Sequence, residues 1–389
     1  PVDPVDPVKP PKPVGPCTTV VACVTAESNE QALPVAHVLD TVIQQQTTSD
    51  LAKEFIGLNS QKAVSDAATE TLPLMHGAGN RIVADAAQGA MQYVQARSQG
   101  TLGAALLSED EARSQHTHVW GTAMGAWDKQ NSRQGAMGYR TDHAGLIIGA
   151  DTDINQRLRL GGALAYTHSD ADSRGSVAQH SLKADTWQAI FYGDYAIDEA
   201  FGIDAQVGLG RSSIEGKRHI GFANKTAKSD YHATIVQAGT GLSYRIGDEK
   251  SHITPFARLD YTHVKSSAYK ESGAGTLNLN VKRQTYDSLV WRAGVRAEHQ
   301  VADSLALLGT ASVGVESLDR DTPITAEFAG APGLAFTTRS TDYGRLVGNV
   351  GVGVVYRPAK NVELIGRYGV NLRKGYTGQN ASATLQVRW

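Results

Sequence analysis

From about residue 116 to Trp389, the end of this 389-residue chain, apolar and polar side chains alternate with a period of two. That period places the apolar side chains on one face of a β-strand and the polar side chains on the other. The pattern therefore predicts an all-β domain over residues 116–389. The pattern is clearest in the last strand. There an apolar row, Ala383, Leu385, Val387 and Trp389, alternates with a polar row, Ser382, Thr384, Gln386 and Arg388.

The same analysis along the domain predicts twelve strands. The connections alternate between tight polar turns, such as 153–157 and 197–201, and longer polar segments, such as 169–182 and 318–343. Short turns on one rim and long loops on the other are typical of an outer-membrane β-barrel. The predicted strands cover residues 117–128, 142–153, 157–169, 183–197, 201–213, 231–246, 252–266, 282–300, 304–317, 343–357, 361–373 and 380–389.

The second face of the strands is too charged for a dry core. In a soluble β-sandwich the apolar face points inward, whereas in a membrane barrel it meets lipid and the other face lines a lumen. Aromatic residues near strand ends, including Trp127 and Tyr195, also favour a 12-stranded antiparallel transmembrane β-barrel. A soluble adhesive sandwich is the alternative, and it would stay in solution without detergent. The predicted lumen-facing residues are Arg258, Asp260, Arg292, Arg296, Glu298 and Arg367.

Residues 1–28 have a different character. Seven of the 13 prolines lie in residues 1–16, which predicts an extended, semi-rigid spacer. Cys17 and Cys23 follow, and they either form a small disulfide loop in an oxidising compartment or remain two separate thiols. No cluster of cysteine or histidine lies nearby to complete a metal site, so we expect no metal.

Residues 29–115 are predicted to be a helical linker, because apolar residues recur there every three or four positions. One helix, over about residues 74–98, is slim because it is rich in alanine. A barrel of twelve strands has room for one helix. We therefore expect this N-terminal helical segment to run through the lumen. The residues along one side of this pore helix are Ile82, Ala86, Ala90, Val94 and Arg97.

Charge and motifs exclude several other classes of protein. The formal net charge is −2 without a long basic run, so nucleic acid is not an expected partner. No stretch has eighteen consecutive apolar residues, as an ordinary transmembrane helix would. The first residues do not have the pattern of a signal peptide, and we expect the chain to be part of a longer exported protein. No Gly-x-Ser-x-Gly motif of a hydrolase is present, and no cofactor is expected.

A helix ahead of twelve strands and an aromatic last residue resemble the translocator region of monomeric autotransporters, the proteins of type V secretion. The resemblance covers residues 29–389. The family usually ends in phenylalanine, whereas this chain ends in Trp389. The segments that carry the resemblance are Asn29-Glu-Gln-Ala-Leu-Pro34, Gly145-Leu-Ile-Ile-Gly-Ala-Asp151, Tyr244 before a turn, and Gly378-Gln-Asn-Ala-Ser-Ala-Thr-Leu-Gln-Val-Arg-Trp389.

The resemblance implies a role in secretion. Periplasmic chaperones and the outer-membrane barrel assembly machinery would deliver and insert the barrel as a monomer, with Leu385, Val387 and Trp389 as a C-terminal assembly signal. The barrel would support export of an N-terminal passenger to the cell surface and anchor it there. An outer-membrane porin or ligand-binding barrel is the alternative, and it would need an open lumen.

Catalysis is not expected in this chain. Some relatives cut their own passenger inside the barrel with a helix asparagine and lumen acidic groups. Here the asparagine pair of that subgroup is absent, and Asn80 stands alone before Arg81. An intact, plugged pore is therefore the expected state, and self-cleavage is the lesser alternative.

Overall fold

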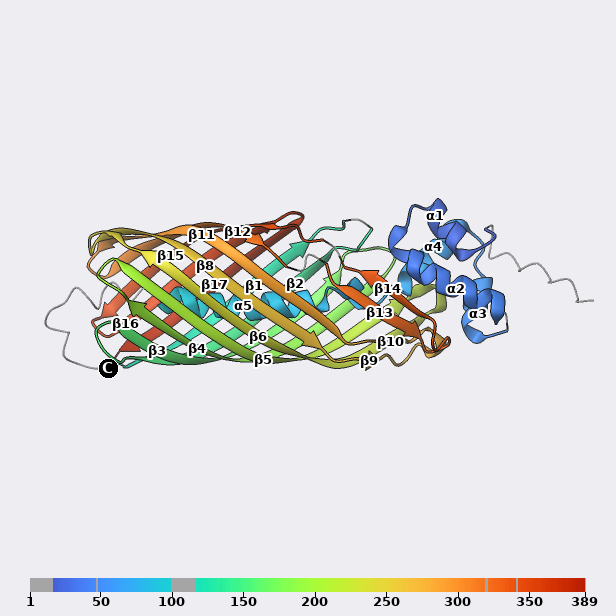
Figure 1. The fold of residues 1–389 in the computed structure, drawn as a ribbon, viewed down its shortest axis with the longest axis horizontal. Helices are drawn as coiled ribbons and strands as arrows, with labels where there is room; N and C mark the ends of the chain where they lie inside the picture. The colour runs from blue at the N-terminus through green and yellow to red at the C-terminus, as the bar shows by residue number, and fades with distance from the viewer. Residues whose placement is uncertain are drawn as a thin grey trace, which may run out of the picture.

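The computed structural model describes residues 17–46, 48–98, 117–133, 135–318, 321–340 and 342–388, so the predicted Pro-rich spacer and Trp389 lie outside the described residues. Twelve long antiparallel strands form a barrel, with a group of helices at one end and a further helix inside (Figure 1). The long strands are β1 Thr117–Gln130, β2 Tyr139–Asp153, β3 Leu158–Ser173, β4 Gln179–Ala196, β5 Phe201–Ile220, β6 Lys225–Tyr244, β8 Ser251–Ser266, β11 Gln284–Ala302, β12 Leu305–Glu316, β15 Leu346–Ala359, β16 Val362–Arg373 and β17 Tyr376–Arg388.

Pairing of the first and last strands closes the barrel. β1 pairs with β17 from His118–Arg388 to Gln130–Tyr376, and β8 pairs with β11. Closure gives the backbone groups of each of these strands a partner on both sides, which a sheet in lipid requires. The predicted 12-stranded antiparallel barrel with an N-terminal helical segment is confirmed.

The outward face of the barrel is apolar and exposed. Leu164 and Phe191 keep 64% and 59% of their surface exposed, and Trp127, Trp187 and Trp291 also point outward. A soluble protein rarely leaves such a continuous apolar surface uncovered, whereas a barrel wall in lipid needs one. No described helix is both long and apolar enough to cross a bilayer.

The two rims differ as predicted, but several strands continue further than the sequence indicated. Short turns, among them 197–200 and 360–361, form one rim, here called the inner rim, where β1 also begins. At the opposite outer rim, two segments that the sequence left between predicted strands are mostly strand: the expected long loop 169–182, and 215–230 between the predicted strands 201–213 and 231–246. Their outward residues are polar because they lie beyond the apolar band, so the alternation that identified the other strands is missing there.

Two loops of the outer rim form a second sheet, of order β14-β13-β10-β9. Helix α2 packs against β14 of this sheet, and α1, α3 and α4 pack around α2 and the neighbouring outer loops. The second sheet and helices α1–α4 together form what we call the outer cap (Figure 1). The remaining elements are α1 Val20–Ala26, η1 Glu30–Ala32, α2 Leu33–Gln45, α3 Asp50–Ile56, α4 Gln61–Glu70, η2 Leu74–Gly77, α5 Gly79–Ser98, η3 Gly221–Ala223, β7 Ile246–Gly247, β9 Tyr269–Lys270, η4 Gly275–Leu277, β10 Leu279–Val281, β13 Pro323–Phe328 and β14 Ala335–Arg339.

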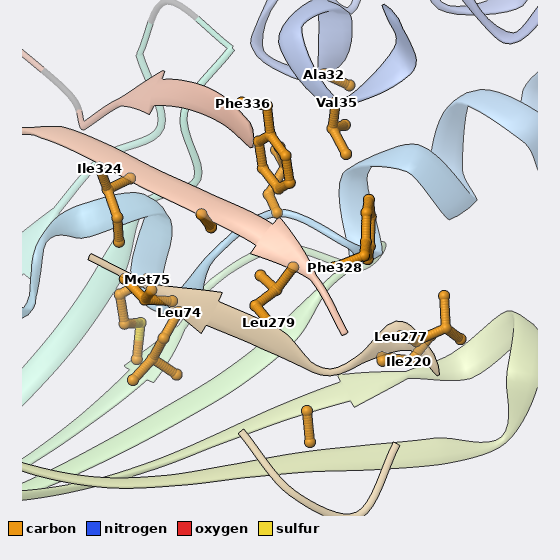
Figure 2. Packing of buried hydrophobic residues seen from close by; sticks show 14 of the residues in the cluster. Ala32, Val35, Leu74, Met75, Ile220, Leu277, Leu279, Ile324, Phe328 and Phe336 are labelled. Carbon is orange, nitrogen blue, oxygen red and sulfur yellow. The ribbon is translucent and has the colours of Figure 1, made fainter. Parts of the chain in front are cut away.

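A single apolar core holds the cap together. Val35 of α2 lies beside Phe336 of β14, while Leu74 and Met75 of η2 lie near Leu279 of β10 (Figure 2). The same cluster continues into the barrel along the first turns of α5. The helices α1–α4 are therefore part of a core shared with the outer loops.

Side chains cap the short helices of this region. Thr19, Ser49 and Ser60 accept hydrogen bonds from the first turns of α1, α3 and α4, as N-cap residues do. Asp40 of α2 accepts two more from Val20 N and Val21 N, at 2.6 and 3.1 Å. Cys17 and Cys23 form a disulfide at the start of α1.

Glu70, at the end of α4, is a buried carboxylate at the junction of cap and barrel. Burial raises its pKa, while hydrogen bonds from Phe222 N and Gly221 N lower it in part. The folded state then binds its proton more tightly than the unfolded chain does. The free energy of unfolding therefore falls as the pH rises from the ordinary pKa of a glutamate through the raised pKa of Glu70.

Candidate functional site

The lumen of the barrel contains α5, and the chain enters it through a tight turn. Pro73 precedes η2, and Gly77 in η2 has a φ of +88°, which favours glycine. Met75 N donates a hydrogen bond to His180 Nδ1 of β4 at 3.0 Å. This turn directs the chain from the outer cap into the barrel.

α5 lies against one side of the barrel wall, not along its centre. It packs on β2–β6, on β8 and on β11. In its inner half, Ala90, Met91 and Val94 meet an apolar group on the wall. This group is formed by Trp120, Ile147, Ile190 and Tyr192. The predicted helix residues Ile82, Ala86, Ala90 and Val94 are all buried. The side chain of Arg97 is outside the described part of the chain.

The predicted lumen charges pair mainly along the wall. Arg258 forms an ion pair with Asp204 and another with Asp260, the latter at 2.6 Å. Arg292 Nη1 lies 3.7 Å from Asp260. All four groups line the lumen, but their charges are largely compensated by neighbouring strands.

The other predicted lumen residues lie nearer the inner rim. The guanidinium of Arg296 stacks on Phe256, 4.5 Å from the ring centroid. Glu298 lies 3.5 Å from Arg357. Arg367 Nη2 donates a hydrogen bond to the Ala96 carbonyl of α5 at 3.2 Å, and thus joins the wall to the last turn of the helix.

At the outer end of α5, a group that we call the Arg81 cluster crosses the lumen. Arg81 bonds to Asp85 at 2.9 Å and donates to the Tyr286 hydroxyl of β11. Its guanidinium lies 5.1 Å from the ring centroid of Tyr343, which accepts a hydrogen bond from Tyr139 of β2 at 3.2 Å. The cluster consists of Arg81, Asp85, Tyr139, Tyr286 and Tyr343.

The sequence reasoning did not identify this cluster. Its one local indication was an Arg and Asp four residues apart in an otherwise small, alanine-rich helix, where such a pair faces one side. The three tyrosines come from three distant segments, so no spacing could relate them. Two further contacts to the wall were also missed, Gln88 to Thr262 at 3.2 Å and Tyr93 to Asn380 at 3.4 Å.

Among the cavities beside α5, two lie toward β11–β17, and the outer of these also reaches β1–β3. The outer one has a volume of about 80 Å³ and the inner one about 210 Å³. Both touch Gln92, Tyr93 and Arg292, so they follow each other along the helix. Within the described residues, no group of three His, Cys, Asp or Glu side chains converges as a metal site would.

Residues 119–369 match the family model described as autotransporter beta-domain. This chain belongs to the autotransporter β-domain family. Within the outer membrane, such a domain is a translocator, and the predicted family, function and location are confirmed. The porin alternative has less support, because the family match and the lumen helix both point to a translocator.

Curated relatives of this autotransporter β-domain are much longer proteins. An extracellular serine protease of Serratia marcescens is 25% identical over 281 residues, which is 70% of this chain and 26% of that protein. Outer membrane protein A of Rickettsia conorii is 24% identical over 313 residues, 77% of this chain and 15% of that protein. The chain thus spans about a quarter of these relatives or less.

Solved structures share the fold of this autotransporter β-domain. The translocator domain of the autotransporter NalP from Neisseria meningitidis has a TM-score of 0.60 at 16% identity, covering 79% of this chain and 99% of that one. The β domain of the Bordetella autotransporter BrkA has a TM-score of 0.51 at 16% identity, covering 70% and 98%.

Proposed function

We propose that this translocator exports an N-terminal passenger through its own barrel, anchors it at the cell surface, and keeps α5 in the pore afterwards as a plug. The path of the chain is the observation that carries the proposal. The outer cap lies beside the long-loop rim, α5 runs inward from it, and β1 begins at the short-turn rim. Bacterial barrels place short turns in the periplasm and long loops outside. A chain exported through the lumen would end in this arrangement.

The same proposal assigns roles to the three regions of the chain. Residues 1–28 act as a spacer, in which the Cys17–Cys23 pair forms after export to an oxidising compartment. Residues 29–115 link passenger and barrel and include the plug. Residues 116–389 form the translocator, which works as a monomer. The six wall charges, from Arg258 to Arg367, stabilise the lumen around the helix.

An epitope inserted after Asn59, between α3 and α4, is expected to be labelled by antibody on intact cells. The same epitope after Glu199, in the inner-rim turn between β4 and β5, is the matched control and should be labelled only after the outer membrane is permeabilised. Both positions are exposed, so insertion leaves the core unchanged. Labelling of the Glu199 epitope but not of the Asn59 epitope on intact cells would contradict the proposed direction.

We further propose that the last strand recruits the barrel assembly machinery, helped by periplasmic chaperones. Leu385 and Val387 continue the outward row of β17, which must pair with β1 to close the barrel. Trp389, outside the described residues, would add an aromatic anchor at the interface. These residues can act before the barrel has closed, because β17 has no partner on its β1 side until then.

Deleting Trp389 is expected to reduce membrane-inserted barrel in cells strongly, while lowering the melting temperature of protein refolded in detergent only slightly. Heat-dependent mobility on gels measures the inserted fraction. A Val119→Ala variant, which alters the outward face of the neighbouring strand β1, is the control and should insert normally. Small and equal effects of the deletion in both assays would leave Trp389 as one interface aromatic and remove the assembly role.

A further inference from the structure

Apolar side chains of the wall enclose α5 more completely in its outer half than in its inner half. There the apolar cluster that continues from the outer cap surrounds Ile82 and Val83 and includes Leu182, Ile235 and Val264 of the wall. In the inner half, apolar packing covers only the side of β1–β4. The opposite side is the inner cavity of about 210 Å³. Within the described residues, the inner half of the helix is therefore packed on one side and borders a cavity on the other.

The Arg81 cluster lies at the inner limit of this apolar core, to which its three tyrosines belong. The outer cavity ends on Arg81 and Asp85. Four of its side chains are at most 3% exposed: Arg81 from the helix, and Tyr139, Tyr286 and Tyr343 from the wall and its loops. Aromatic rings and a paired guanidinium span the gap between α5, β2 and β11.

The passage inward of this cluster has an excess of positive charge. The inner cavity is lined by Arg292, Arg296 and Arg367, and the acidic residue on its lining is Glu298. Because Arg292 is paired with Asp260, the excess comes from Arg296 and Arg367. Glu298 is shared with Arg357, which lies 3.5 Å away. Arg296 Nη2 is buried and has no hydrogen-bond partner. A narrow passage with an excess of cationic groups in its wall attracts anions and repels cations.

We propose that the Arg81 cluster, and not α5 as a whole, is the seal of the plugged pore, and that the passage behind it selects small inorganic anions. The inference rests on the proposed role of α5 as a plug and adds where the seal lies and which ions would pass if it opened. Since Arg81 contacts residues of β11 and of the loop before β15, the seal depends on both helix and wall.

The test is the conductance of the full chain in planar bilayers bathed in potassium chloride. Arg81→Ala should raise the conductance severalfold, and in a salt gradient its reversal potential should show that chloride is more permeant than potassium. Tyr343→Ala removes the wall side of the same seal and should open the same passage. With two variants, the test does not depend on the folding of either one alone. Gln92→Ala is the matched control, because it shortens a side chain of α5 inward of the seal and should leave the pore closed.

A third step tests selectivity. Adding Arg296→Gln and Arg367→Gln to the Arg81→Ala chain should shift the reversal potential toward zero. Closed pores in folded Arg81→Ala and Tyr343→Ala proteins would overturn the seal, and an open pore that prefers potassium or neither ion would overturn the selectivity. Wild-type conductance as high as that of a chain lacking α5 would instead overturn the plug itself.

Discussion

Removing residues 1–98 is expected to raise the conductance of the barrel by about an order of magnitude or more, because α5 is the element that occupies its lumen. The barrel should remain folded, since its strands are joined to each other by complete ladders and close through β1 and β17. Loss of apolar contacts to Trp120 and Ile190 will lower its stability but not open the sheet. Single-channel recordings and heat-dependent gel mobility measure the two effects.

A shorter deletion separates the plug from the outer cap. Removing residues 1–72 takes away α1–α4 but keeps η2, α5 and the Arg81 cluster. This chain should stay closed, because Leu74 and Met75 still hold the start of α5 against the outer rim. Equal, large conductance from both deletions would show that the cap blocks the pore and that α5 does not.

Glu271→Gln is expected to destabilise the outer cap by about 3–5 kcal/mol, because it leaves a buried guanidinium without a counter-charge. Arg218 of β5 donates to both oxygens of Glu271, at 3.2 and 2.6 Å, and to the Glu70 carbonyl of α4 at 2.8 Å. A further hydrogen bond reaches the Leu277 carbonyl at 2.9 Å. With side chains 0% and 2% exposed, the pair joins a barrel strand, a loop and the last helix of the cap.

Hydrogen exchange resolved by peptide should show faster exchange in α4 and in β9–β10, while the strands facing lipid stay protected. Asp321→Asn is the matched control. Asp321 lies 3.2 Å from Arg339, whose side chain is 65% exposed. An exposed ion pair of this kind contributes at most about 1 kcal/mol to stability. Similar small effects of the two substitutions would mean that Arg218 finds another partner, and would contradict the buried-pair argument.

Local periodicity was enough to predict the barrel wall, its closure and the face of each strand that meets lipid. In β17, Leu385 is 49% exposed while Thr384 and Gln386 are 4% and 3% exposed, as the alternation in the sequence requires. The reason is that side-chain direction in a strand depends only on position along the strand. The outer ends of β3–β6 were missed because beyond the apolar band their outward residues are polar, and the period no longer appears.

Periodicity also predicted a slim lumen helix, but not the side of the wall on which it lies. Partners in the lumen are far apart in the chain: Arg81 and Tyr286 are 205 residues apart, and Arg258 and Asp204 are 54 apart. Strand register and barrel curvature bring such residues together, and neither is encoded in a local pattern.

The outer cap shows the same division. The sequence by itself determined that residues 29–72 form helices, because their apolar residues recur at helical spacing. Only the tertiary structure decided that these helices share a core with Phe328 and Phe336 of the outer loops. An amphipathic helix specifies that one face must be buried, but the surface that buries it is chosen by the loops that the closed barrel holds at its outer rim.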